Sequence, residues 1–180
     1  MADVGYERAT IVSIAKAAGL APGLVHYHFG AKRDVLLALF ERVIAVAEAR
    51  YQRRLKAAGD DPWRRLDAAI DALVSLDDDA DHLAAACWIQ IGSEVPRIEA
   101  VAGPYRAAVG TQHRIIARHV TEIRHHQGQS DTDAPLVAAG IMAAVEGAFR
   151  LAAAAPDVVP WGQTAVLVRQ MARGLLGDGR

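Results

Sequence analysis

The sequence predicts an all-α protein with an N-terminal helix-turn-helix and a larger helical body. Apolar residues recur at helical spacing through most of the chain, and no stretch alternates polar and apolar residues over the length of a strand. Two short helical patterns near the N-terminus are separated by a turn of four residues. With 180 residues, 52% of them hydrophobic and 23% charged, the chain can bury one or two cores and is neither disordered nor fibrous.

The first two helical patterns define the helix-turn-helix. The Thr10 hydroxyl can accept a hydrogen bond from an unpaired amide of the first turn, so we expect the first helix to begin there. Gly19 tolerates the positive φ that ends a helix, and Pro22 suits the first turn of a second helix. Val25 and Phe29 fall on one face of this second helix and are expected to pack inward. Its outer face then carries Gly23, Leu24, His26, Tyr27 and His28.

A long helix is expected next, from Lys32 to about Ala57, followed by a loop over residues 59–62. We place the domain boundary inside this helix, giving a helix-turn-helix domain over residues 1–44 and a second helical domain over residues 45–180. Further helices are expected over residues 63–74 and 83–90, and after Pro96 and Pro104 up to residue 126.

The last two helices, about Leu136–Ala155 and Pro160–Leu176, are unusually apolar. A helix that is apolar nearly all round must be covered on two sides, and a chain of this size has little left to provide the cover. We therefore expect these helices to form a homodimer interface, although an ordinary core helix would have a similar composition. The expected interface residues are Gly140, Ala144, Gly147, Val166 and Met171.

Charge and composition limit the possible functions. Residues 1–56 carry nine basic and five acidic side chains, whereas the rest of the chain carries 11 and 16, so the N-terminal part is the basic one. Neither a signal peptide nor an apolar run long enough to span a bilayer is recognised, which favours a cytoplasmic protein. The single cysteine, Cys87, is expected to be a small buried hydrophobe. Enzyme chemistry and a cofactor are not expected. A metal site is not expected either, because acids such as Asp79 and Asp81 are common at the start of a helix and need no metal there.

The helix-turn-helix matches a known pattern at Thr10, Ile14-Ala15, Ala18-Gly19, Gly23, Val25, Tyr27, His28-Phe29 and Lys32. At these residues the sequence resembles the DNA-binding domain of the tetracycline-repressor (TetR) family of bacterial transcription regulators. The resemblance implies a repressor that is released from a palindromic DNA operator by a small molecule. It also implies the following contacts: phosphates at Thr10, Tyr27, His28 and Lys32, and bases at Pro22, Gly23, Leu24 and His26.

The chain departs from the family pattern in two ways. Ala21 and Leu24 replace hydroxyl residues that would cap a helix and bind a phosphate, so the base-reading surface is poor in polar groups. Residues 1–9 hold only the end of the family's first helix, and we expect that helix to be truncated, encoded upstream or lost. The alternative is therefore a dimeric helical ligand-binding or interaction protein with weakened or lost DNA binding.

An effector site is expected in the body, where polar groups occur among apolar ones. A well-packed core with a few satisfied polar groups would look the same. The expected effector is largely apolar, with a cationic group drawn to Glu146. Two short runs, at residues 88–96 and 145–149, also resemble regulators of choline and betaine genes. The expected ligand-binding residues are Trp88, Gln90, Ile91, Tyr105, His113, Ile116, Met142, Glu146 and Phe149.

Overall fold

The computed structural model describes residues 5–74 and 79–177, which form only helices, turns and loops. This confirms the expected all-α fold. The elements in chain order are α1 (Gly5–Arg8), α2 (Ile11–Ala17), α3 (Pro22–His28), α4 (Lys32–Ala58), α5 (Pro62–Val74), α6 (Asp79–Glu94), α7 (Glu99–His126), α8 (Ala134–Ala154), the 3₁₀ turn η1 (Trp161–Gln163) and α9 (Thr164–Leu176).

The local signals place the helix ends where the sequence predicts them. Thr10 Oγ1 accepts a bond from the Ser13 amide at 3.1 Å, and Ser13 Oγ accepts one from the Thr10 amide at 2.9 Å, so α2 begins with a capping box. Gly19 has φ +68°, a conformation that a side chain would strain, and α3 begins at Pro22. Pro104 does not interrupt α7, which runs as one helix through it.

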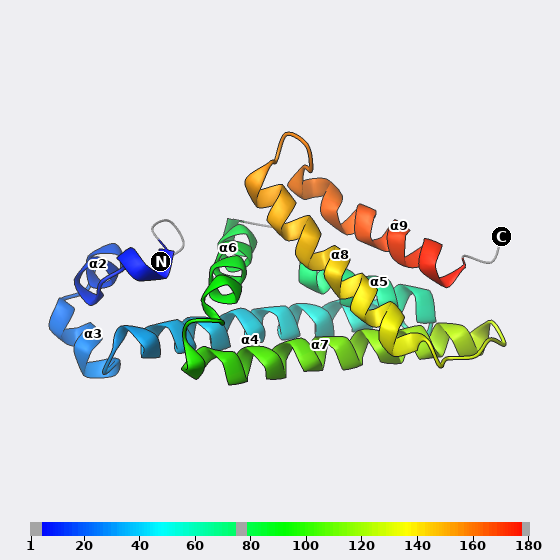
Figure 1. Ribbon diagram of the computed structural model, residues 1–180, viewed down its shortest axis with the longest axis horizontal. Coiled ribbons are helices and arrows are strands. Elements are labelled where there is room, and N and C mark those ends of the chain that lie inside the picture. Colours follow the sequence, from blue (N-terminus) through cyan, green and yellow to red (C-terminus); the bar gives the residue numbers. More distant parts are fainter. Residues whose placement is uncertain (1–4, 75–78, 178–180) are drawn as a thin grey trace.

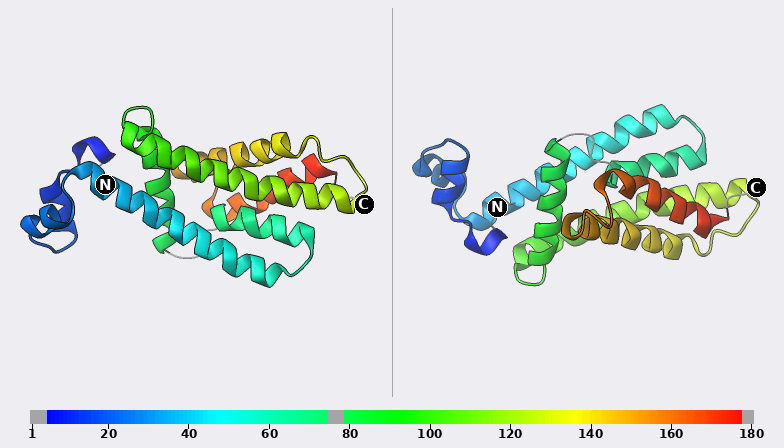
Figure 2. Two further views of the ribbon diagram at one scale, coloured as in Figure 1. Left: turned by 90° about the horizontal axis from the view of Figure 1, so that it is seen from below. Right: turned by 90° about the horizontal axis from the view of Figure 1, so that it is seen from above.

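Figures 1 and 2 show an elongated molecule with the helix-turn-helix at one end. Helices α4 and α7 both run along the long axis, α5 returns beside α4, and α6 crosses them. The α8–α9 hairpin covers the other side of the body and ends near the tip of α7. The helix α4 therefore begins at the helix-turn-helix and runs to the far end of the body, without a break at the expected domain boundary.

The body contains two cores of buried side chains. The larger core lies mainly among α4, α5, α7, α8 and α9 and includes Tyr51, Leu66 and Ile141. A smaller core joins the first half of α4 to α6 and α7, and it includes Phe40 and Trp88. Cys87 is buried in this smaller core, as expected. Because α4 contributes to both cores, a change in either one acts on the helix that leads to α3.

By length and composition, α8 could cross a membrane, and among the described helices no other meets those criteria. Only 33% of its most apolar stretch is buried in this chain, so a large apolar surface stays uncovered. Helix α9 lies beside α8, and the exposed apolar side chains of both helices are considered below as a contact between two copies.

Candidate DNA-binding surface and effector pocket

The outer face of α3 is exposed along its whole length, as the sequence predicts. Tyr27 is 84% exposed and Leu24 44% exposed, and His26 and His28 are exposed beside them. Val25 is buried and anchors the inner face. The Tyr27 and His28 rings meet edge to face with their centroids 5.2 Å apart. The helix thus presents aromatic and apolar groups, with imidazoles as its polar donors.

The start of α3 has the features that a surface near DNA requires. Pro22 occupies its first turn, and Ala21 provides no side-chain cap. A Cβ added at Gly23 would meet no atom within 4 Å, so this position is open to an approaching molecule. Thr10 is exposed nearby in sequence, and a hydroxyl that accepts one bond can still donate its proton to a phosphate oxygen.

Lys32, which was expected to contact a phosphate, also has partners within the chain. Its Nζ donates to the carbonyl oxygens of Tyr6 at 2.9 Å and Glu7 at 3.3 Å, and it lies 4.2 Å from the centre of the Tyr6 ring. Carbonyl oxygens near the end of a helix need partners from outside the helix, and Lys32 of α4 is such a partner for α1. Lys32 therefore fastens α1 to the start of α4, a role that the sequence pattern did not indicate.

The residues expected at a dimer interface are all at least partly exposed on α8 and α9. Gly140, Val166 and Met171 are exposed, whereas Ala144 and Gly147 are half-buried. Large apolar side chains also lie exposed on these two helices: Leu136, Leu151, Leu167 and Leu175. Exposed apolar patches of this kind on a soluble protein mark contact surfaces.

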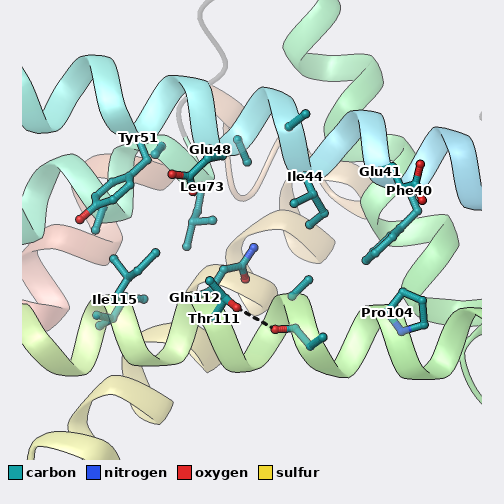
Figure 3. Close-up of a pocket in the computed structure, with 17 residues that line it drawn as sticks. Phe40, Glu41, Ile44, Glu48, Tyr51, Leu73, Pro104, Thr111, Gln112 and Ile115 are labelled. Carbon is teal, nitrogen blue, oxygen red and sulfur yellow. Dashed lines mark hydrogen bonds between the residues drawn. The ribbon is translucent and has the colours of Figure 1, made fainter.

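A pocket of about 500 Å³ lies between α4 and α7, with α5 at its inner side. Figure 3 shows Phe40 at one end and Tyr51 at the other, with Ile44 between them on α4 and Pro104 to Ile115 along α7. We call this pocket the α4–α7 trough. Its volume lies within the range of small-molecule sites. A second cavity of about 50 Å³ continues inward, and both are lined by Ile44, Ala47, Ala72, Leu73 and Gln112.

A buried polar network fixes the Tyr51 end of the trough. The Tyr51 hydroxyl lies 2.9 Å from His119 Nε2 and accepts a bond from Arg118 Nη2 at 3.0 Å. His119 Nδ1 lies 2.9 Å from Glu122 Oε2. Burial lowers the pKa of His119, although Glu122 opposes this, and burial also raises the pKa of Tyr51. The neutral ring and the neutral phenol are thus the favoured forms.

The residues expected to bind a ligand do not share one site. Only Ile116 lines the trough, whereas Trp88, Glu146 and Phe149 line the small inner cavity. Tyr105, His113 and Met142 lie in an open hollow between α7 and α8. Gln90 and Ile91 lie on α6, beside Tyr6. The expected set mixed several faces of three helices, because sequence spacing does not give the rotation of one helix against another.

Two of these polar residues are satisfied inside the protein. The Trp88 indole Nε1 donates to Glu146 Oε1 at 2.7 Å, and His113 Nε2 lies 2.9 Å from the Pro135 carbonyl oxygen. Burial and the nearby Glu146 carboxylate raise the pKa of Tyr105. Trp88 and Tyr105 also stack, with ring centroids 5.1 Å apart. These contacts hold α6, α7 and α8 together.

Helical spacing in the sequence does indicate the residues of α4 that line the trough. Phe40, Ile44, Ala47 and Tyr51 recur at spacings of three or four, which makes an apolar stripe on the long helix. In the structure this stripe borders the trough.

Two family models match this chain. The model of the bacterial regulatory proteins of the tetR family matches residues 1–39, and that of the C-terminal part of BetI-type transcriptional repressors matches residues 62–177. The regulator BetI of Stenotrophomonas maltophilia is 36% identical over 69 residues, and that of Rhizobium meliloti is 32% identical over 99 residues. These matches cover 38% and 55% of this chain but only 35% and 48% of the two relatives.

Solved structures share the whole fold. A transcriptional regulator of Saccharomonospora viridis, determined in complex with choline, has a TM-score of 0.79 at 23% identity, and one from Rhodococcus has 0.82 at 24%. Each covers 99% of this chain and is itself covered over 90% of its length. The second family model alone spans well over half of the chain. The chain therefore belongs to the TetR family of bacterial regulatory proteins and carries a C-terminal domain of the BetI type.

Proposed function

We propose that this protein is a transcriptional regulator that binds DNA through α3 and responds to a small molecule in the α4–α7 trough. The observation that carries the proposal is the continuity of α4, which starts beside the helix-turn-helix and lines the trough with Phe40, Ile44 and Tyr51. A ligand that contacts this helix acts on the position of α3. Only a difference in affinity between two arrangements can shift the equilibrium between them.

For DNA binding, we propose that α3 enters the major groove, with His26, Gly23 and Leu24 toward the bases and Pro22 at the edge of that surface. Thr10, Tyr27 and His28 are the proposed phosphate contacts. The exposure of Leu24 and Tyr27 supports this assignment, since large apolar side chains on a free surface otherwise cost solvation. A cytoplasmic location follows from a role on bacterial DNA.

We propose a homodimer through α8 and α9, which would pair two copies of α3 on a palindromic operator. In helix-turn-helix dimers the two half-sites lie about 34 Å apart, or at another spacing matched to the operator. Release by the effector makes the protein a repressor. The relative from Saccharomonospora was solved with choline, which supports a small molecule as the class of effector for this body.

The DNA part of the proposal is tested with Gly23→Glu. The new side chain has open space and adds a carboxylate where phosphates or bases would lie, so operator affinity should fall by more than about tenfold. Gly103→Glu on α7 is the matched control, because it makes the same charge change in open space outside the helix-turn-helix. Operator sequences are first selected from random duplexes, and binding is then followed by fluorescence anisotropy.

A second candidate function is a dimeric helical ligand-binding or interaction protein with weakened or lost DNA binding. The absence of a side-chain cap on α3 and the apolar Leu24 on its outer face favour it. If selection enriches no duplex, this second function holds and the regulator is contradicted. If Gly23→Glu and Gly103→Glu bind the selected duplex equally, the assignment of α3 as the helix that contacts DNA is contradicted.

A further inference from the structure

We propose that the α4–α7 trough takes an elongated apolar cation, with its ammonium group beside Glu41 and Phe40 and its apolar chain directed toward Tyr51. The regulatory consequence of binding rests on the proposed function, whereas binding itself does not. The shape of the trough, the chemistry of its walls and the charges at its two ends each contribute to the assignment.

The trough is long and narrow. Phe40 and Tyr51 close its ends and lie eleven residues apart on α4, which corresponds to about 16 Å along the helix axis. The opposite wall runs from Pro104 to Ile116 on α7, over a similar length. A compact cation of the size of choline would contact only a fraction of this space. An extended chain contacts both walls over their whole length.

Most of the wall is apolar. Alanine and isoleucine side chains from α4, α5 and α7, together with Leu73 of α5, make up most of the lining. Such surface binds alkyl or aromatic groups by removing them from water. The polar groups are few, and Thr111 already donates to the Ala107 carbonyl oxygen at 3.0 Å. The wall therefore selects for an apolar body.

The charged residues among those that line the trough are Glu41 and Glu48, both on α4. Neither lysine, arginine nor histidine lines it. The inner cavity adds Glu146 together with Arg50, whose Nη1 donates to the Ala72 carbonyl oxygen at 3.3 Å. An anionic ligand in the trough would thus meet carboxylates and no basic side chain, whereas a cation gains a favourable potential.

The two ends of the trough differ in charge. At the Tyr51 end, the Arg118 guanidinium lies 3.0 Å from the tyrosine hydroxyl, and Glu48 accepts a bond from Gln52 at 2.7 Å. At the other end, the Phe40 ring points toward α7, Trp88 packs against it with the ring centroids 6.1 Å apart, and Glu41 is the next residue on α4. Aromatic faces attract ammonium groups, and Glu41 makes no ion pair within the described residues. The cation therefore belongs at the Phe40 end.

The test uses ligands that share one chain and differ in charge. Decyltrimethylammonium, decanol and decanoate, each below its micellar concentration, are titrated into the whole protein by calorimetry without DNA. We expect the cation to bind about tenfold or more tightly than decanoate, with decanol between them. Choline should bind at least about a hundredfold more weakly than decyltrimethylammonium, because each buried methylene contributes about fourfold in affinity.

Three variants locate the site. Glu41→Gln should lower the affinity for decyltrimethylammonium about threefold to fivefold and leave the affinity for decanol unchanged, as expected for a partly exposed ion pair. Glu48→Gln is the matched control on the same helix and should have a smaller effect. Ala107→Trp should lower the affinity for all the decyl ligands, because Ala107 lines the trough and is exposed, so that a larger side chain there would fill part of the space.

Several outcomes would overturn the proposal. These are a preference for decanoate, choline binding as tightly as the decyl cation, a larger effect of Glu48→Gln than of Glu41→Gln, and no effect of Ala107→Trp. Release of operator DNA is measured in a separate titration. Tight binding of the decyl cation without DNA release would leave the ligand class standing and contradict the proposed regulatory role, so the two failures are distinguishable.

Discussion

The hydroxyl of Tyr51 and Nε2 of His119 lie 2.9 Å apart in the interior of the body, although 68 residues separate them in the chain. The Glu122 carboxylate accepts a bond from the other ring nitrogen, so the neutral tautomer leaves Nε2 free to accept from the tyrosine. The network therefore has a defined direction of donation, from Tyr51 to His119 to Glu122. It holds the tyrosine ring in one orientation at the end of the trough.

This network makes the stability of the protein depend on pH. Burial lowers the pKa of His119 from its usual value of 6.5, so the folded state binds this proton more weakly than the unfolded state does. The contribution to stability is complete above about pH 6.5 and is lost as the pH falls through the lowered value. We expect the Tm to fall in this range, and to fall less in His119→Gln. Equal pH profiles for the two proteins would contradict this.

Lys32 should act on DNA binding through α1. Lys32→Ala removes its bonds to the Tyr6 and Glu7 carbonyl oxygens, which loosens the support of α3 and should weaken binding to all sequences by about threefold to tenfold. The slope of log affinity against log salt should not change. A slope lower by about 1 would instead indicate a phosphate contact. Arg33→Ala, which removes a charge from an adjacent exposed side chain, is the control.

The exposed face of α9 should control assembly. Met171→Glu places a carboxylate in the proposed contact between two copies, and an unpaired buried charge should raise the dimer dissociation constant by at least about thirtyfold. Val158→Glu makes the same kind of change at a site that is 78% exposed in the loop before α9, and should have little effect. Sedimentation equilibrium measures both. A monomeric parent protein at micromolar concentration would refute the interface.

The bond between Trp88 and Glu146 should contribute to stability rather than to catalysis or metal binding. Glu146→Leu would leave the buried indole N–H without its acceptor, which costs about 1–3 kcal/mol. Glu146→Gln keeps an acceptor oxygen and should cost much less. Urea unfolding measures both. Similar losses in the two variants would show that the charge of Glu146, and not the hydrogen bond, is what matters.

The local signals of the sequence were sufficient for the helix-turn-helix. Thr10, Gly19 and Pro22 act through bonds and backbone angles within a few residues of themselves, so their effect is visible in a short stretch. The exposed face of α3 and the buried Val25 followed from helical spacing alone. Cys87 was likewise placed correctly from its apolar neighbours.

The trough could not be located in the same way. Its shape depends on how α4 and α7 diverge, and that divergence is set by the packing of α4 on α5 and of α7 on α5 and α8. Glu146 was expected to face a ligand because it is a carboxylate among apolar residues. The structure gives it Trp88 as a partner, a contact across 58 positions that no local pattern encodes. The contacts of Lys32 within the chain were missed for a similar reason, since its partners lie 25 and 26 residues earlier.

Because α4 is long, a small tilt of the helix moves its N-terminal end over a larger distance. Tyr51 is held by His119 and Arg118, and it lies 19 residues from Lys32, or about 28 Å along the axis. A rotation of about 5° around this fixed point moves the start of the helix by about 2.5 Å, given the same rise per residue. The buried network thus acts as a fixed point for α4. A ligand that tilts the helix slightly near Phe40 would move the start of the helix by most of the width of a side chain.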